Sequence, residues 1–354
     1  MVELKEANAV IQPCAPSDIQ AVMRFIHEHW KSGHILSLNR SFLDWQHKNK
    51  NNPYYNFIIA KDKSNGAVLG VLGYITNTQY DPALTDKTVW LALWRVCDDA
   101  GAPGIGLALR RFLEEFEKPQ AIGVIGISQS TLMLYKPFGY EQGALNQFYM
   151  VNKNKKAFKL IGGFDNRYES NADVDSGKKL VKIDKRDWTK LTKGVKFPHN
   201  EQSAPQKSPA YFQNRYLDHP IYQYEIYALE ENMDLKGLFV VRKAEYQGNY
   251  ALRCVDHWGR GEDMSGLKAE FQDLLAAYDA EYLDILNFGI EDIYFEKAGL
   301  LKLDPRKPVV IPNHYEPFEQ KNVHLHFAMK TDKPYVIFKG DGDQDRPSRE
   351  GKTS

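Results

Sequence analysis

The stretch from Val96 to Phe116 reads VCDDAGAPGIGLALRRFLEEF, and it decides the fold class that we predict. The apolar run from Val89 to Val96 is typical of a buried strand. After it, four apolar residues recur at helical spacing: Leu109, Phe112, Leu113 and Phe116. Gly104-Ile105-Gly106 therefore stands between a strand and a helix. Glycines there let a ligand approach the backbone, and the first N–H groups of the helix attract an anion.

The elements around this loop indicate where it lies in a sheet. Two apolar runs around a turn, Asn56 to Ala60 and Val68 to Tyr74, precede the Val89 strand. A further strand from Ala121 to Ile127 and a helical segment from Ser130 to Phe138 follow it. The glycine loop thus follows the third strand of a meander. A dinucleotide-binding loop would follow the first strand of a βαβ unit, so that fold is disfavoured.

The second half of the chain repeats the same order of elements, which indicates duplication of a whole domain. The repeated elements are strands at 224–229, 235–241 and 250–255, the loop Gly259-Arg260-Gly261, a helix, a strand at 283–286 and a helix at 290–298 before Gly299. We predict an α/β fold with mixed sheets: a first domain over 1–152, a connection over 153–206 with short strands such as 179–183, and a second domain over 207–354.

Composition excludes several classes of protein. The 354 residues carry 46 Lys plus Arg and 46 Asp plus Glu, and this balance gives no reason to expect nucleic acid or a membrane surface as partner. Cys14, Cys97 and Cys254 are far apart, so we expect neither a disulfide framework nor a metal site. The sequence has no signal-peptide pattern and no apolar run of about 18 residues, so a cytoplasmic location is expected. Oligomeric state is not predicted.

The glycine loop resembles the pyrophosphate motif of the GCN5-related N-acetyltransferase (GNAT) superfamily, with Gly101 at the position where that family has Gln or Arg. The segment from Ser128 to Tyr140 resembles the family's last helix and aromatic turn. The resemblance implies an acyl-CoA co-substrate and Tyr135 as the proton donor to the departing thiolate. It also implies that the following residues bind CoA: Val96, Ala102, Gly104, Ile105, Gly106, Leu107 and Ser128.

The chemistry of amide formation fits these residues. A backbone N–H near Val96 would stabilise the developing oxyanion, and Tyr135 would act as the acid. Asp98, His34 or a water chain could take the proton of the amine, and no base is required if the neutral amine binds from solution. The alternative is that the glycines form only a tight turn and that Tyr135 is a core residue.

The second copy lacks the proton donor and the phosphate-binding loop of the first. Phe295 stands four residues before Gly299, as Tyr135 stands four before Gly139, and a Phe cannot donate a proton. Glu262 and Asp263 follow the second glycine loop, where they would repel phosphate. We expect this domain not to bind CoA productively and to shape the acceptor site.

The whole chain resembles tandem-GNAT sugar N-acyltransferases of bacterial surface-polysaccharide (O-antigen, lipopolysaccharide or capsule) pathways. The resembling phrases are Trp30 to Leu36 with Trp45; Asn214 to Tyr216 with His219, Pro220 and Tyr222; Ile311 to His314 with Pro317 and Phe318; and Asp341 to Pro347. The implied acceptor is a dTDP-3-amino-3,6-dideoxyhexose, with 3-hydroxybutanoyl-CoA or acetyl-CoA as donor. The candidate acceptor-binding residues are His34, Trp45, Arg215, Tyr216, His219, His314, Asp341 and Asp343.

Each of these residues also has a structural interpretation. Trp45 could be packing, Arg215 could tie two domains together, His314 could be a loop residue, and the Asp series could be a solvated tail. A calcium loop starting at Asp341 would need a Glu at its twelfth position, which is absent. Two other functions remain open: a GNAT enzyme acting on an aminoacyl or peptidoglycan-precursor amine, and a non-catalytic CoA-binding module.

Overall fold

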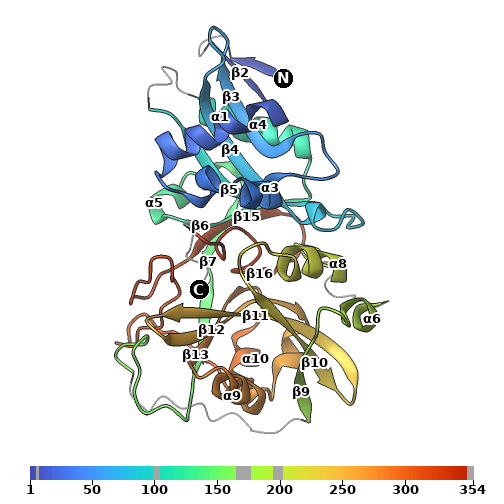
Figure 1. Ribbon diagram of the computed structural model, residues 1–354, viewed down its shortest axis with the longest axis vertical. Coiled ribbons are helices and arrows are strands. Elements are labelled where there is room, and N and C mark those ends of the chain that lie inside the picture. Colours follow the sequence, from blue (N-terminus) through green and yellow to red (C-terminus); the bar gives the residue numbers. More distant parts are fainter. Residues whose placement is uncertain (5–7, 99–103, 165–176, 194–201, 349–354) are drawn as a thin grey trace.

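The computed structural model describes residues 1–4, 8–98, 104–164, 177–193 and 202–348. They form two large mixed sheets stacked along the long axis of the molecule, with helices against each sheet (Figure 1). The predicted α/β class with mixed sheets is confirmed.

The first sheet contains the meander predicted from the sequence. Its strand order is β1 (Val2–Leu4), β2 (Ala9–Cys14), β3 (Tyr55–Asp62), β4 (Val68–Thr76), β5 (Thr88–Val96), β6 (Ala121–Ile127), β15 (His326–Thr331) and β7 (Glu141–Ala144). Pairing is antiparallel except between β5 and β6, which are parallel because α4 (Ile105–Glu117) crosses over between them.

Helices cover both faces of this sheet. The apolar stripe of α4 packs on one face through Ile105, Leu109 and Leu113. The other face is covered by α1 (Ile19–Phe25), a π-helical turn (Ile26–Trp30), α2 (Ile35–Leu38) and α3 (Arg40–His47). α5 (Gln129–Leu132) and a 3-10 turn (Lys136–Phe138) follow β6, and a second 3-10 turn (Asn77–Gln79) follows β4.

The second sheet repeats the order of the first. It runs β14 (Leu301–Lys302), β8 (Asn146–Val151), β13 (Ala280–Phe288), β12 (Asn249–Gly259), β11 (Asp234–Tyr246), β10 (Tyr224–Glu231) and β9 (Lys178–Lys182), with β16 (Ile337–Phe338) paired to β13. The predicted repeat is thus present, and the strand expected in the connection is the edge strand β9. α9 (Lys268–Ala277) and α10 (Asp292–Lys297) pack on its outer face.

The two sheets exchange strands. β8 belongs to the first half of the chain but pairs with β13 in the second sheet, whereas β15 comes from the carboxyl-terminal part and lies between β6 and β7 in the first sheet. Neither of the ranges 1–152 and 207–354 therefore coincides with one sheet. Because each sheet needs a strand from the other half to complete its backbone hydrogen bonds, the two halves are interlocked.

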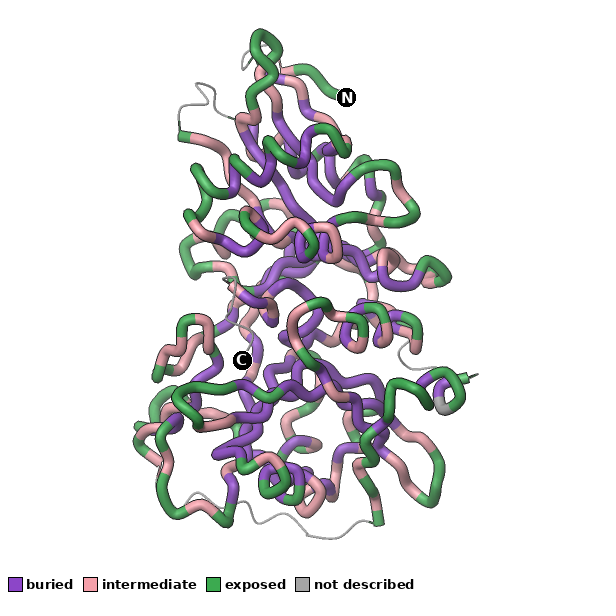
Figure 2. The backbone as a smooth tube through the Cα atoms, viewed as in Figure 1, coloured by how far each residue is buried: buried purple, intermediate pink, exposed green. Residues whose placement is uncertain are grey.

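A continuous apolar core fills the space between the sheets. It contains Trp90, Ile125 and Phe327 from the first sheet and Ile226 and Val240 from the second. α6 (Trp188–Thr192), α8 (Pro209–Phe212) and a π-helical turn (Gln213–Leu217) border this core. Buried backbone accordingly runs through the junction as well as through each sheet (Figure 2). The segment after β16 enters this junction, where most of the predicted acceptor-binding residues lie.

Candidate functional site

The first sheet opens between β5 and β6. Their parallel pairing runs from Thr88–Ala121 to Leu91–Val124 and stops there, although β5 continues to Val96 and β6 to Ile127. On the β4 side, Gly73 pairs with Leu93 and Tyr74 pairs with Leu91, so Ala92 is an extra residue in a bulge. A bulge bends its strand and increases its twist, and beyond Leu91 and Val124 the two strands no longer pair; we call this unpaired stretch of β5 and β6 the gap.

The side of β5 that faces β6 forms ladder pairs with β6 only as far as Leu91. The N–H of Cys97 donates to Leu69 O on β4 (2.9 Å). The backbone N–H groups of successive residues in a strand point to opposite neighbours. The N–H of Val96 therefore points away from β4, toward the gap. A backbone N–H near Val96 is the oxyanion donor that we predict from the sequence.

The amino-terminal end of α4 borders the same gap. Gly104 precedes the helix with φ +99°, a left-handed conformation that favours glycine, and a Cβ there would meet nothing within 4 Å. The N–H groups of Ile105, Gly106 and Leu107 belong to the first turn, where no intrahelical acceptor exists. Such N–H groups, together with the helix dipole, attract an anion in general, and we predict this role for them here. Ala102, the remaining predicted CoA residue of this loop, lies outside the described residues.

Trp94 connects this helix start to Tyr135. A Cβ on Gly106 would lie 3.4 Å from Trp94 Nε1, so the indole packs directly against that glycine. The rings of Trp94 and Tyr135 meet edge to face with centroids 6.2 Å apart. Tyr135 is buried, and burial raises the pKa of its phenol to about 12. The phenol therefore stays protonated at neutral pH and can donate a hydrogen bond.

Ser128 holds the segment that carries Tyr135. Its hydroxyl accepts from the N–H of Thr131 (3.1 Å) and so caps α5 at the end of β6. Its Oγ also lies 2.9 Å from Ser130 Oγ. These contacts give Ser128 a local role in shaping the far wall of the gap.

The two candidate bases occupy different environments. Asp98 has a side chain that is 81% exposed and pairs with Arg95 (2.9 Å) just beyond β5. His34 is buried, and its Nδ1 accepts from the N–H of Leu36 (3.2 Å), which makes it the cap of α2. Burial and the nearby Arg346 lower the pKa of His34 to about 3. An imidazole with so low a pKa is a weak base toward an ammonium group.

The second sheet has a corresponding gap, but the chain itself fills it. β12 and β13 pair in parallel only as far as Cys254–Ile285, and Val255 is an extra residue in the register with β11. β16 then pairs with the free side of β13, and the N–H of Gly340 donates to Val255 O (2.8 Å). Beside this filled gap, Phe295 is stacked on Phe148 at 4.0 Å. A pocket of about 430 Å³ remains at the outer end, beside Gly259 and Arg260.

Most of the predicted acceptor residues meet around the segment 339–348, which we call the carboxyl-terminal strap. Arg215 is buried and donates to Gly340 O (3.1 Å), to Gly342 O (2.6 Å) and to Tyr80 Oη (2.9 Å). Its guanidinium also lies 5.4 Å from the ring of Trp45. Arg215 thus ties the first domain to the strap.

The other predicted acceptor residues surround Arg215 and the strap. Trp45 packs edge to face on His219 (4.4 Å), and the Tyr216 hydroxyl donates to Asp256 (2.7 Å).

At the far end of the strap, Ser348 O accepts from the N–H of Ile35, the residue after His34. His314 is exposed on the loop whose preceding residue, Asn313, contacts Lys339. Side chains from four distant parts of the sequence therefore converge.

The Asp residues of the strap are buried and paired. Asp341 contacts Lys207 (2.7 Å), and Asp343 contacts Arg346 (3.1 Å). Asp345 accepts two hydrogen bonds from Arg242 (2.8 and 3.0 Å). Arg242 therefore keeps the pKa of the Asp345 carboxyl far below its usual range, despite burial. These carboxylates are not a solvated tail: they hold the strap in place.

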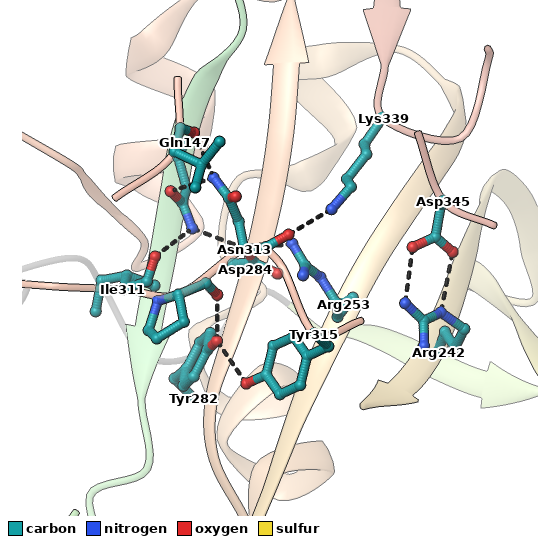
Figure 3. A network of polar contacts seen from close by, with 12 residues as sticks. Gln147, Arg242, Arg253, Tyr282, Asp284, Ile311, Asn313, Tyr315, Lys339 and Asp345 are labelled. Atoms are coloured by element: carbon teal, nitrogen blue, oxygen red, sulfur yellow. Dashed lines mark hydrogen bonds and ion pairs between the residues drawn. The ribbon is translucent and has the colours of Figure 1, made fainter. Parts of the chain in front are cut away.

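A buried polar network supports the strap from the second sheet (Figure 3). Arg253 on β12 pairs with Asp284 on β13 (2.9 Å), and Gln147 donates to the same carboxylate (2.8 Å). The Lys339 ammonium donates to Asn313 O (2.6 Å). Burial, and next the charge of Arg253, lower the pKa of Lys339 to about 7. This network was not predicted from the sequence, because its members come from five separate segments.

Trp94, Tyr80 and Gln344 were not among the predicted site residues. Trp94 had a detectable signal, since it lies on the predicted strand two residues before Val96. Gln344 lies within the resembling stretch Asp341 to Pro347, but no role was predicted for it. Tyr80 had no signal, because its contact with Arg215 joins distant segments.

Comparisons with known proteins bear on this geometry. No protein-family model matches the chain, and no curated protein sequence matches it. Solved structures do match. A GCN5-related N-acetyltransferase from Anabaena variabilis superposes with a TM-score of 0.54 at 10% identity, over 91% of this chain and 72% of that one. A probable N-acyltransferase from Enterococcus faecalis superposes with a TM-score of 0.52 at 7% identity, over the same shares.

Both matches extend over nearly the whole chain and therefore include both sheets. The chain has two GNAT-like domains in tandem. The first GNAT-like domain carries the gap between β5 and β6, and in the second domain β16 pairs with β13 at the corresponding place.

The described residues contain neither a candidate membrane span nor a candidate metal cluster. No helix in this part of the chain is both long and apolar enough to cross a membrane. Nor do three or more His, Cys, Asp or Glu side chains gather in it as a metal site.

Proposed function

We propose that the protein is an acyl-CoA-dependent N-acyltransferase. It transfers an acyl group, 3-hydroxybutanoyl or acetyl, to the amino group of a nucleotide-linked amino sugar such as dTDP-3-amino-3,6-dideoxy-galactose. The observation that carries the proposal is the gap between β5 and β6, which has the anion site of α4 at one end and Tyr135 on its wall.

The gap suits an extended thioester arm. The arm can lie between β5 and β6 like an additional strand, with its amides against the outward backbone groups of β5. The pyrophosphate would bind the N–H groups of Ile105, Gly106 and Leu107, after Gly104 has turned the chain. Binding of the cofactor's diphosphate at α4 then fixes the depth at which the thioester carbon lies.

The reaction needs few groups from the protein. The neutral amine attacks the thioester carbon, a C–N bond forms and the C–S bond breaks. An outward N–H of β5 at Trp94 or Val96 would stabilise the oxyanion. The Tyr135 phenol would donate a hydrogen bond to the leaving thiolate, and the proton lost by nitrogen finally resides on that sulfur. Because His34 is a weak base and Asp98 is exposed beside Arg95, the proposal lets the amine arrive neutral and assigns neither residue a compulsory proton transfer.

The acceptor would bind between the domains. Support comes from the convergence of Trp45, Arg215, Tyr216 and His219 on the carboxyl-terminal strap, beside the face of the first sheet covered by α1–α3. In this proposal the buried charges of Arg215, Asp341 and Asp343 position the strap, and exposed groups such as His314 contact the nucleotide.

The test combines binding with turnover. Isothermal titration with acetyl-CoA and 3-hydroxybutanoyl-CoA should show micromolar or tighter binding. Release of free thiol should then depend on a dTDP-linked amino sugar, and mass spectrometry should show the N-acylated product. Free glucosamine and an aminoacyl peptide serve as comparison acceptors. Absence of binding to every CoA thioester would overturn the proposal, and turnover with the peptide alone would overturn the assignment of the acceptor.

A further inference from the structure

The strap places one side chain directly on the splayed part of β6. Gly126 has φ +80° and is the extra residue in the register between β6 and β15. A Cβ at Gly126 would come within 2.6 Å of three atoms of the Gln344 carboxamide. The carboxamide therefore rests on the backbone of β6 at the point where glycine alone leaves room for it.

The neighbours of Gln344 are fixed, while Gln344 itself remains accessible. Asp341, Asp343 and Asp345 are at most 5% exposed and are held by Lys207, Arg346 and Arg242. Gln344 is half-buried, and its Nε2 donates to Asp343 Oδ1 (2.9 Å). One hydrogen on Nε2 and lone pairs on Oε1 are left for another partner. A segment held by buried ion pairs thus presents a half-buried Gln344 beside β6.

The position of this carboxamide relates it to the gap. Gly126 lies two residues beyond Val124, the last residue of β6 that pairs with β5. From Gln344 the strap continues to Ser348, whose backbone O accepts from the N–H of Ile35 at the start of α2. It therefore runs from the splayed wall of the gap to the helical layer on the face where an acceptor would approach.

We propose that Gln344 belongs to the acceptor subsite of the first domain and hydrogen-bonds a hydroxyl group of the acyl-accepting substrate. This inference rests on the proposed function and adds to it a residue and a substrate chemistry. A carboxamide both donates and accepts, as a hydroxyl does, and it carries no charge. It therefore suits a neutral, hydroxyl-bearing ring, and the second domain contributes to catalysis by delivering this group across the domain junction.

The test uses the full-length enzyme and two substitutions, Gln344→Ala and Gln344→Met. Methionine keeps the length of the side chain but cannot form the hydrogen bonds. Both variants should raise the KM for the amino-sugar acceptor about tenfold, which corresponds to the loss of about 1.4 kcal/mol of hydrogen bonding. The Kd for acyl-CoA and the melting temperature should stay unchanged. Gln247→Ala, in an exposed turn of the second sheet, is the matched control and should change none of these.

The outcomes separate the two proposals. If the wild-type enzyme turns over and both Gln344 variants keep the acceptor KM, the role of Gln344 is wrong while the proposed function stands. If the variants change the acyl-CoA KM instead, Gln344 faces the donor, and the acceptor assignment is overturned. If wild-type protein binds no CoA thioester, both proposals fall. An acceptor analogue that lacks the contacted hydroxyl should show the same KM in wild type and in Gln344→Met.

Discussion

The indole of Trp94 lies between the first turn of α4 and the ring of Tyr135, against Gly106 on one side and 6.2 Å from the phenol centroid on the other. This contact joins the two ends of the proposed donor site. Trp94 on β5 therefore contacts both the first turn of α4 and the ring of Tyr135.

Replacing Tyr135 by phenylalanine tests the role of its hydroxyl. The ring contacts with Trp94 and Tyr140 are kept, so the fold should be unaffected. Loss of a hydrogen bond to a developing thiolate should lower kcat about 10- to 100-fold. The Kd for acyl-CoA should not change. Steady-state kinetics and titration calorimetry measure the two quantities.

Tyr140→Phe is the control for that substitution. Tyr140 lies in the same core, and burial raises the pKa of its phenol too, but its hydroxyl donates to Glu114 (3.4 Å). This variant should retain kcat within a factor of about two, as expected for a change away from the reacting atoms. Equal losses in the two variants would show that the phenol of Tyr135 has no specific role.

Gly104→Ala tests the anion site. The left-handed φ of +99° is unfavourable for alanine, so the loop should rearrange and the first N–H groups of α4 should lose their alignment. We expect the Kd for acyl-CoA to rise about tenfold or more. Gly66→Ala, at φ +75° in the exposed turn between β3 and β4, imposes a similar backbone strain away from the gap and should leave the Kd unchanged. An unaltered Kd in Gly104→Ala would argue against phosphate binding at α4.

Lys339 should make stability depend on pH. Burial lowers its pKa from 10.5 to about 7, so between these values the unfolded chain holds a proton that the folded protein has released. The free energy of unfolding should therefore rise from about pH 7 to pH 10, and the destabilisation by the buried ammonium should be fully present below pH 7. Lys339→Met removes this titration, so its stability relative to wild type should be highest at pH 6 and decline toward pH 10.

Urea unfolding at pH 6, 8 and 10 measures the effect. Lys50→Met, in an exposed turn, is the control for loss of one lysine and should differ from wild type by a constant amount. A constant difference between wild type and Lys339→Met over this range would mean that Lys339 stays charged when folded.

The exchange of strands predicts that the halves cannot fold separately. A fragment of residues 1–152 lacks β15, which leaves β6 and β7 without their shared partner, and its β8 has no sheet to join. Expressed alone, it should aggregate or lack a cooperative thermal transition, because unpaired strand edges are aggregation sites. Co-expression with residues 153–354 should yield a soluble one-to-one complex. A monomeric, cooperatively melting 1–152 fragment would contradict this prediction.

Much of the fold was readable because its signals are local. The apolar run at 89–96, the glycines at 104 and 106 and the stripe of α4 identify a strand, a loop and a helix within twenty-odd residues, and the same order recurs after 224. β15 could not be placed from the sequence. The run His326–Thr331 indicates a strand at most, and its neighbouring residues give no information about its pairing partners, β6 and β7.

The sequence by itself determined the duplicated α/β architecture and the glycine loop before α4, because periodicity and backbone freedom are properties of neighbouring residues. Only the tertiary structure decided that the domains exchange strands, that β16 fills the second gap, and that Asp341, Asp343 and Asp345 are buried ion-pair partners while Gln344 remains accessible. A carboxylate in a polar segment looks the same in sequence whether it faces water or a buried arginine. Arg242, the partner of Asp345, lies 103 residues away, and burial and charge pairing exist only after the chain has packed.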